Sequence, residues 1–347
     1  MKALIRPRDT APPTTLAIAA APKFVHLKVH SAYSLLEGAL PIGALARLSK
    51  ELGFPAVGLT DTNNLFGILE FSEKLAAVGI QPIVGAAVAI GFQEKSLEGS
   101  GPGLPQSRIG ANHDGLIALY AMDEAGYANL MKLVSRAHLG IADTEGPHIK
   151  LADLARYTHG LIVLTGGPDG PIDGALRGNQ PAAATARLEA LSRLFDNRLY
   201  IEIQRHGLNN ETDVEPQLLR LAYEHGIPIV ASNEAYFAVP QDYEAHDALL
   251  CIAESRALVE DDRRRLSREH YFKSAEQMVE VFEDLPEALE NTIEIAKRCA
   301  FRPRGRKPIL PRFVSAGDSA SADEQLALEA AELQSQAEEG LKIRLAS

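Results

Sequence analysis

Short β-rich runs that end in polar residues alternate with helical patterns along most of the chain. This alternation is typical of βα units that build a parallel sheet. Seven runs are predicted to be strands: residues 24–30, 56–60, 82–90, 116–121, 161–165, 199–204 and 227–231. Seven strands of this kind favour a barrel over an open sheet.

Helical spacing is clearest between the fourth and fifth predicted strands. Tyr127, Leu130, Met131, Val134 and His138 recur at i, i+3, i+4, i+7 and i+11, which places them in one stripe along a helix. We interpret this stripe as part of the core. From about residue 239 the strand pattern stops and helical patterns continue to the end of the chain.

The pattern divides the chain into four parts. Residues 1–22 are predicted to be a disordered leader, and residues 23–240 an α/β barrel. Residues 95–115 contain five Gly, two Pro and three Ser, which predicts a flexible insertion within the barrel. Residues 241–312 are expected to form a helical extension and linker, and residues 313–347 the truncated start of another domain.

Composition narrows the classes of function. The 347 residues include 35 basic and 46 acidic side chains, a net charge of −11, which argues against a module that grips nucleic acid over its whole surface. Cys251 and Cys299 form no C-x-x-C pair, which excludes a cysteine zinc ribbon and predicts reduced thiols in a cytoplasmic protein. No apolar run is long enough to span a membrane.

Polar residues gather where the predicted strands end, and ligands of parallel α/β folds bind at those ends. His26, Lys28 and His30 alternate along the first predicted strand, so we expect their side chains to share one face. Asp61 follows the second strand, and Glu234 follows the seventh. This group of imidazole, ammonium and carboxylate side chains at one end of the predicted barrel is compatible with a pocket that derives from a metal site.

The motifs at these ends occur in the order FVHLKVHSAYSLLEG, AVGLTDTNNLFGILEF, GIQPIVGAAVAI, EAGYANLMKLVSRAHLG, GLIVLTGG, YIEIQRHG, VASNEAYF and EAHDALLCI. Over residues 24 to about 312 the chain resembles the amino-terminal region of bacterial replicative DNA polymerase III alpha subunits. The resemblance implies a polymerase and histidinol phosphatase (PHP) domain, a distorted seven-stranded (β/α)7 barrel followed by a mainly helical extension. Some members of that family hold a metal cluster there and act as a proofreading 3′ to 5′ exonuclease.

Against the family's intact metal-binding pattern, this chain has lost most of the implied ligands. Lys28 stands where the H-x-H motif has its first His, and Thr62 replaces the His of T-D-H-G-N. The chain also has Ala87 for a Glu, Leu116 for a His and Tyr236 for the last His. The vestigial pocket therefore comprises Lys28, His30, Glu37, Asp61, Thr62, Asn64, Ala87, Leu116, His206, Glu234 and Tyr236.

Three of these residues, His30, Asp61 and Glu234, remain weak candidates for metal ligands. Three scattered ligands are too few for a multinuclear cluster. An ammonium group inside the cluster would repel a divalent cation, so we expect Lys28 to form a salt-bridge network with Glu37, Asp61 or Glu234. His206 could bind a phosphate or simply pack against a neighbouring loop.

Two functions stay open from the sequence. In the first, the resemblance implies a scaffold that is not catalytic alone, receives the proofreading exonuclease subunit and supports the remaining polymerase domains. In the second, the chain is a metal-dependent phosphoesterase, an exonuclease or pyrophosphatase, with His30, Asp61 and Glu234 as a reduced ligand set. A stand-alone histidinol-phosphate-type phosphatase is disfavoured by the match to the later polymerase segments.

The 347 residues lack the paired carboxylates that a polymerase active site needs. No D-x-D occurs in the chain, although polymerisation needs paired carboxylates that hold two metal ions. No catalytic residue and no cofactor are therefore expected in this fragment. By resemblance, the full-length protein would use Mg²⁺ and contact primer-template DNA and the sliding clamp, without a membrane partner.

Overall fold

The computed structural model describes residues 21–92, 113–142, 144–306, 313–314 and 321–346. The chain separates into two compact units, residues 1–304 and residues 305–347, and each is described by itself. The predicted leader lies outside the described residues except for its last two positions. Residues 95–112 of the predicted insertion also lie outside them.

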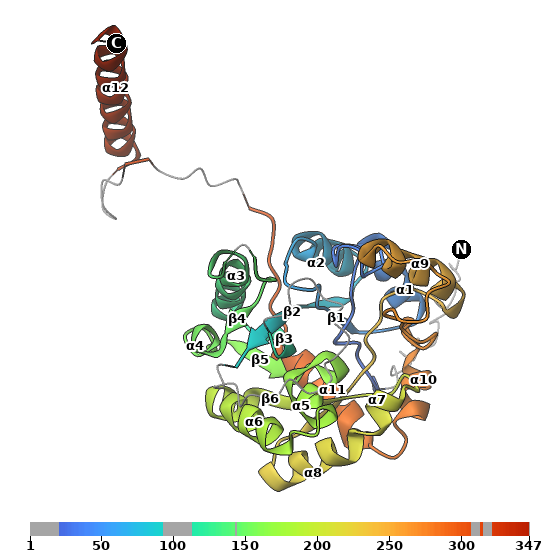
Figure 1. The fold of residues 1–347 in the computed structure, drawn as a ribbon. Helices are drawn as coiled ribbons and strands as arrows, with labels where there is room; N and C mark the ends of the chain where they lie inside the picture. The colour runs from blue at the N-terminus through green and yellow to red at the C-terminus, as the bar shows by residue number, and fades with distance from the viewer. Residues whose placement is uncertain (1–20, 93–112, 143, 307–312, 315–320, 347) are drawn as a thin grey trace, which may run out of the picture. The chain divides into compact units, whose positions relative to one another are not determined.

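The first unit is built on one sheet of seven strands. Their order is β1-β2-β3-β5-β6-β7, with β4 beside β2 (Figure 1). The strands are β1 (Ala56–Leu59), β2 (Gln81–Gly91), β3 (Gly115–Ala121), β4 (Ile149–Lys150), β5 (Leu161–Leu164), β6 (Leu199–Gln204) and β7 (Ile229–Ser232). Six predicted strands are thus confirmed with ends within two residues, and β4 was not predicted.

The expected parallel sheet is wrong at one strand, because β3 runs antiparallel to both of its neighbours, β2 and β5. The remaining pairs, β1 with β2, β2 with β4, β5 with β6 and β6 with β7, are parallel. Parallel neighbours need a crossover, usually a helix, whereas antiparallel ones do not. Between β2 and β3 the chain carries the Gly- and Pro-rich residues in place of a helical pattern. The barrel is therefore a distorted one.

Residues 24–30 do not form the regular strand that was predicted. They make isolated bridges, His26 to Val57 beside β1 and Val29 to Ala235 just beyond β7. The amide N–H of His30 donates to the carbonyl oxygen of Ala235 at 2.9 Å, and that of Thr60 donates to Val29 at 2.9 Å. This irregular segment joins the two ends of the sheet.

Helices cover the sheet and continue beyond it (Figure 1). The helices up to β7 are α1 (Ile42–Glu51), α2 (Ile68–Ala77), α3 (Glu124–Leu139), α4 (Leu151–Leu154), α5 (Pro171–Arg177), α6 (Pro181–Phe195), α7 (Asn209–Thr212) and α8 (Glu215–His225). The extension after β7 contains α9 (Tyr243–Glu254), α10 (Ala275–Val281) and α11 (Pro286–Arg298). In the second unit, α12 spans Ala322–Ala346.

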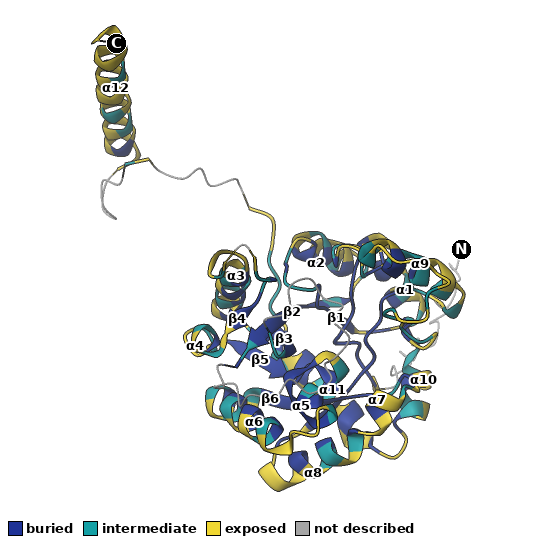
Figure 2. Ribbon diagram, in the orientation of Figure 1, coloured by how far each residue is buried: buried dark blue, intermediate teal, exposed yellow. Residues whose placement is uncertain are grey.

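Figure 2 shows the strands as buried. Successive side chains along a strand point alternately into two separate hydrophobic cores. On β5, Leu161 and Val163 belong to the large core shared with helices α1, α2 and α6, whereas Ile162 and Leu164 face the barrel interior. Ile295 and Cys299, on and just after α11, fill the interior core. The helical extension thus closes one end of the barrel.

The predicted core stripe on α3 is confirmed in part, because Leu130 is buried and Tyr127 and Val134 pack against the large core. The buried residues of α3 are Gly126, Leu130, Leu133 and Ala137, whereas Met131 and His138 are exposed. Gly126 decides which face is buried, because a Cβ atom there would lie 1.9 Å from the carbonyl oxygen of Gly160. The helix can therefore approach the start of β5 only along the Gly126 face.

Candidate functional site

The Lys28 side chain is fully buried at the mouth of the barrel, between two carboxylates. Its Nζ donates to the carbonyl oxygen of Gly166 at 2.8 Å and lies 3.4 Å from Oε1 of Glu202 and 3.4 Å from Oε1 of Glu234. Glu202 faces the interior from β6, with the same parity as Tyr200. The ammonium group thus links the N-terminal segment to three other parts of the barrel.

The charge state of Lys28 follows from two opposed effects. Burial by itself lowers the pKa of Lys28, but attraction from Glu202, Glu234 and Asp169 outweighs burial, so the pKa is raised above its ordinary value. Lys28 is therefore a cation at neutral pH.

Glu202 receives further donors besides Lys28. Its Oε1 accepts hydrogen bonds from Nε2 of Gln204 at 2.6 Å and from Oγ of Ser232 at 2.5 Å. Its Oε2 accepts a hydrogen bond from the amide N–H of Gly166 at 3.2 Å. A buried carboxylate needs hydrogen-bond partners, and here protein groups supply them.

His30 and Tyr236 complete the surroundings of Glu234. Nε2 of His30 lies 2.9 Å from Oε1 of Glu234, and the Tyr236 hydroxyl donates to the same oxygen at 2.9 Å. The His30 ring is stacked on the Tyr236 ring with centroids 4.4 Å apart, and its Nδ1 lies 3.2 Å from Oγ of Ser34. Both ring nitrogens of His30 therefore already have protein partners.

Asp61 holds the loop that follows His30. Its carboxylate accepts hydrogen bonds from the amide of Ser31 at 2.7 Å, from the Ser31 hydroxyl at 2.8 Å and from the Ser34 hydroxyl at 2.8 Å. Gly38 closes the loop, because a Cβ atom there would lie 2.0 Å from the carbonyl oxygen of Ser31. Although Ser34 is beside His30, its hydroxyl is buried and donates to Asp61, so it offers no exposed nucleophile.

A second group lies around Glu37, apart from the Lys28 network. The Thr62 hydroxyl donates to Oε2 of Glu37 at 2.7 Å, and Nη1 of Arg264 lies 3.4 Å from Oε1 of Glu37. Asn64 uses its Nδ2 to donate to the carbonyl oxygens of Tyr33 at 2.9 Å and Thr62 at 3.0 Å. These polar groups fix the loops of the mouth to one another.

The other predicted pocket residues have structural surroundings. Ala87 is buried in β2 and bridges Thr62, and Leu116 is buried in β3 opposite Ala89. Nδ1 of His206 lies 2.6 Å from Oε1 of Glu211, and its ring stacks on that of His270 with centroids 3.8 Å apart. His206 thus pairs with Glu211 instead of with a residue of the Lys28 network.

His26 does not share a face with Lys28 and His30, contrary to the prediction. Its ring stacks on Phe272 with centroids 4.1 Å apart, and Nε2 donates to the carbonyl oxygen of Lys273 at 2.8 Å. Burial lowers the pKa of His26 to about 4. The face alternation fails because residues 24–30 are not a regular strand.

The arginine run 263–268 is bound within the chain. Arg263 contacts both carboxylate oxygens of Asp247, at 2.5 and 2.6 Å, and Arg268 lies 3.1 Å from Glu244. Arg265 donates to the carbonyl oxygen of Glu260 at 2.9 Å. Arg263, Arg265 and Arg268 therefore have acceptors within the chain.

Known proteins with similar sequences show the family of this chain. The PHP domain family matches residues 26–206, which is more than half of the chain. The chain belongs to the PHP domain family. It is also 45% identical over 323 residues to DNA polymerase III subunit alpha of Caulobacter vibrioides, covering 93% of this chain and 27% of that protein.

DNA polymerase III subunit alpha of Pseudomonas fluorescens is 37% identical over 293 residues, covering 84% of this chain and 24% of that protein. This PHP chain therefore spans about a quarter of the length of these relatives. Among solved structures, an amidohydrolase from Chromobacterium violaceum aligns with a TM-score of 0.35 at 14% identity, covering 61% of this chain and 87% of that one. A two-domain Bacteroides vulgatus protein, described as containing a PHP-like metal-dependent phosphoesterase, aligns with a TM-score of 0.38 at 11% identity, covering 80% and 69%.

The donor set of this PHP domain does not fit a metal cluster. No group of three or more His, Cys, Asp and Glu residues within the described part of the chain is arranged to hold a metal ion. Of the three candidate ligands, Asp61 uses both oxygens for serine donors, and Glu234 is shared by His30, Tyr236 and Lys28.

No helix in the described part of the chain is long and apolar enough to cross a bilayer.

Of the three carboxylates predicted to contact Lys28, the structure confirms one, Glu234. Glu234 contacts Lys28, whereas Asp61 is held by serines and Glu37 by Thr62 and Arg264. Sequence reasoning missed Glu202, the other carboxylate beside Lys28. Its signal is a charged residue at an interior position of the apolar run LYIEIQ, where burial demands an oppositely charged partner.

Proposed function

We propose that this chain is the PHP region of a replicative DNA polymerase III alpha subunit and serves there as a scaffold and docking platform without metal-dependent catalysis. The whole protein would extend primer-template DNA with Mg²⁺ and act with the sliding clamp. In this proposal, the PHP region supports the remaining polymerase domains and receives the proofreading exonuclease subunit.

The observation that carries this proposal is the place of Lys28. Its ammonium group lies 3.4 Å from each of two buried carboxylates, Glu202 and Glu234, in a network that also contains His30. A fixed positive charge at that point neutralises the carboxylates and repels a divalent cation. The residues that would otherwise collect a metal are thereby held together by an internal ion pair.

Metal analysis tests the absence of a catalytic centre. The full chain and its Lys28→His variant would be dialysed against zinc or manganese and then analysed by plasma mass spectrometry. We expect less than about 0.1 metal per chain in the wild type, since a buried cation opposes binding. Near-stoichiometric metal in the wild type, with hydrolysis of a DNA 3′ end that His30→Ala abolishes, would refute the proposal.

Docking needs a separate measurement. Purified chain and purified proofreading exonuclease subunit would be mixed and followed by size-exclusion chromatography with light scattering. A stable complex is expected, and a failure to co-elute at micromolar concentrations would contradict the docking role. This result is independent of the metal content.

The second candidate is the metal-dependent phosphoesterase with His30, Asp61 and Glu234 as ligands. It is favoured only by the survival of these three side chains near the mouth. The two functions differ in the effect of a chelator, because only the phosphoesterase would lose activity when its metal is removed.

A further inference from the structure

Four arginine side chains, at the floor of the barrel and beside it, form no ion pair with a carboxylate among the described residues. The floor is the end where the parallel strands begin, opposite the mouth that holds Lys28. Arg198 directly precedes β6 there, and Arg298 is the last residue of α11. Arg302 and Arg304 follow in the segment that leaves α11. We call these four residues the arginine strip.

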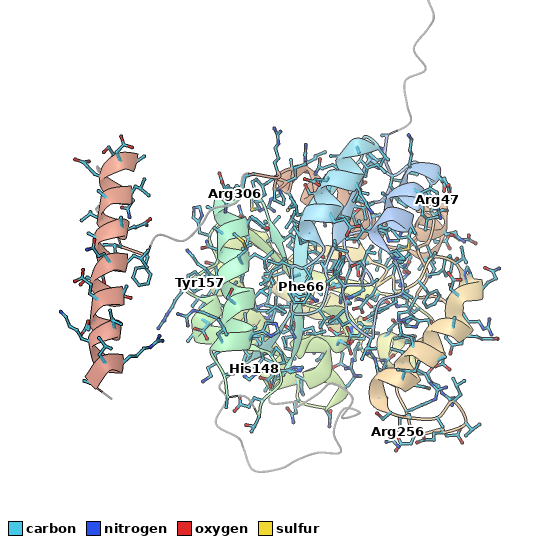
Figure 3. All side chains as sticks on the ribbon, turned by 90° about the horizontal axis from the view of Figure 1, so that it is seen from above. Arg47, Phe66, His148, Tyr157, Arg256 and Arg306 are labelled. Carbon is cyan, nitrogen blue, oxygen red and sulfur yellow. The ribbon has the colours of Figure 1, made fainter. Side chains whose placement is uncertain are left out.

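Most of the other described arginines lie in ion pairs with carboxylates. Examples are Arg47, which lies 3.7 Å from Glu51, and Arg256, which lies 2.8 Å from Glu260; Figure 3 labels both arginines. Carboxylates are not scarce, since the sequence has 46 acidic side chains against 35 basic ones. The lack of ion pairs along the strip therefore leaves its charge available to an anion from outside the chain.

The first two guanidinium groups of the strip are held in place by oxygen atoms that carry no charge. Nη1 of Arg198 donates to the carbonyl oxygen of Leu161, at the start of β5, at 2.7 Å. Nη1 of Arg298 donates to the carbonyl oxygen of Asn197 at 3.0 Å and to the hydroxyl of Tyr200 at 2.8 Å. The Nε and Nη2 groups of both arginines donate to no described residue and are open to solvent. Each guanidinium is thus fixed in position with donors left for a ligand.

These two guanidinium groups also repel each other. Asn197, whose carbonyl oxygen holds Arg298, is the neighbour of Arg198 in the sequence. Burial and the nearby Arg298 lower the pKa of Arg198, whereas Asp196 raises that pKa by less. Both groups stay cations, because arginine keeps its proton in proteins. A bound anion would relieve the repulsion between two like charges that no carboxylate separates.

The segment after α11 continues the strip along the surface of the barrel. Figure 1 shows this segment passing between α2 and α3. The Ser72 hydroxyl on α2 donates to the carbonyl oxygen of Pro303 at 2.7 Å, and the Phe301 ring lies 5.7 Å from the ring of Tyr127 on α3. Arg302 lies between these two anchored positions, so the path of the charges is fixed although their side chains make no described contact.

The extent of the strip selects the kind of anion. Its charges lie before β6, at the end of α11 and between α2 and α3, so one small anion cannot contact them all, whereas a chain of phosphates can. Guanidinium groups bind phosphate through pairs of parallel hydrogen bonds. Phe301 lies among the charges and is only half-buried, and single-stranded nucleic acids bind where aromatic rings alternate with cations.

We propose that the arginine strip binds the phosphate backbone of single-stranded nucleic acid. The inference goes beyond the scaffold and docking roles, because it gives this PHP domain a nucleic-acid contact of its own. Binding through phosphates is independent of base sequence. It needs only a local row of cations, which agrees with the net charge of −11 over the whole chain.

The salt dependence of binding tests this site. The full chain would be titrated into a fluorescein-labelled oligothymidylate of about 20 nucleotides, and fluorescence anisotropy gives the Kd between about 20 and 200 mM salt. On a single strand, log Kd rises with log salt by about 0.7 for each phosphate contact, so four contacts predict a slope of about 3. Removing two contacts, in Arg302→Ala with Arg304→Ala, should lower the slope by about 1.4 and raise the Kd at about 20 mM salt at least about tenfold.

Two further double variants separate the site from net charge and from folding. Arg47→Ala with Arg256→Ala removes the same charge from other surfaces and should change the Kd less than about threefold. Arg302→Lys with Arg304→Lys keeps the charge and should keep the slope. Because Arg302 and Arg304 make no described contact, their alanine variant should unfold at the same urea concentration as the wild type.

The outcomes are distinct from those for the scaffold role. Lack of oligothymidylate binding at about 20 mM salt, or an unchanged slope in Arg302→Ala with Arg304→Ala, would refute the strip as a binding site. An oligoglutamate of equal charge that displaces the labelled strand as well as unlabelled oligothymidylate does would refute nucleic acid as its ligand. None of these results changes the expected docking or metal content, which have their own measurements. Binding that is lost in the alanine variant and kept in both controls would establish the site.

Discussion

Replacing Lys28 by methionine is the most direct test of the ion-pair network. The variant keeps a side chain of similar length but removes the only ammonium group that lies within 3.4 Å of both Glu202 and Glu234 among the described residues. Two buried carboxylates would then face each other without their cation, and the carbonyl oxygen of Gly166 would lose its donor. We therefore expect a large loss of stability.

The magnitude follows from burial and from the donors that remain. Removing one partner of a buried ion pair costs about 3 to 5 kcal/mol. Glu202 keeps its hydrogen bonds from Gln204, Ser232 and Gly166, which places Lys28→Met near the lower end, at about 3 kcal/mol.

Urea unfolding followed by circular dichroism measures this difference, since the chain contains no tryptophan to report by fluorescence. The raised pKa of Lys28 means that its contribution is complete below the pKa of an unfolded lysine, about 10.4, and is lost as the pH rises through the folded value. The deficit of Lys28→Met should therefore stay constant between about pH 6 and 8.

A second substitution shows whether charge is the cause. Adding Glu202→Gln to Lys28→Met removes one unpaired carboxylate and should recover about 1 to 2 kcal/mol, a coupling typical of residues in contact. Glu202→Gln alone should destabilise the wild type. A loss below about 1 kcal/mol for Lys28→Met, or no recovery in the double variant, would refute the network as a structural element.

Three further predictions concern the same mouth and its surroundings. Lys28→His should gain zinc binding that Lys28→Met lacks, as measured by isothermal titration, because an imidazole would join His30 and Glu234; equal binding by both would count against it. The pKa of His26 is lowered to about 4 from an unfolded value of about 6.5, so the unfolded chain takes up the proton first as the pH falls. Acidification from about pH 7 to 5 should therefore cost the wild type about 2 kcal/mol more stability than it costs His26→Phe. Equal losses of stability would contradict this prediction. Asp61→Asn, which weakens three hydrogen bonds from serines, should cost about 2 to 3 kcal/mol in urea unfolding, and an unchanged midpoint would refute its anchoring role.

The fold was largely predictable because strand and helix patterns are local properties. The run at β6 was identified with its ends, since alternating core faces and β-branched residues mark it directly. The direction of β3 and the irregular path of residues 24–30 were not predictable, because they depend on which segments pair in space. The wrong face assigned to His26 follows from that irregular path.

The sequence predicts several residues of the site, but neither Glu202 nor the pairing of the charges. Lys28, His30 and Glu234 were identified as one pocket, and the structure brings them together. Which carboxylates face Lys28 depends on how β6 and the segment after β7 are placed around the mouth. Glu202 lies 174 positions from Lys28 along the chain, and its one clear sign is a charge within an otherwise apolar strand.

The contacts of Lys28 also explain how a barrel can keep its shape without a metal cluster. One side chain from the irregular N-terminal segment reaches the loop after β5 through Gly166, the interior of β6 through Glu202 and the segment after β7 through Glu234. A cation that joins several strand ends restrains them as coordinate bonds would, but it needs no ion from solution. The stability of the mouth should then be independent of metal supply.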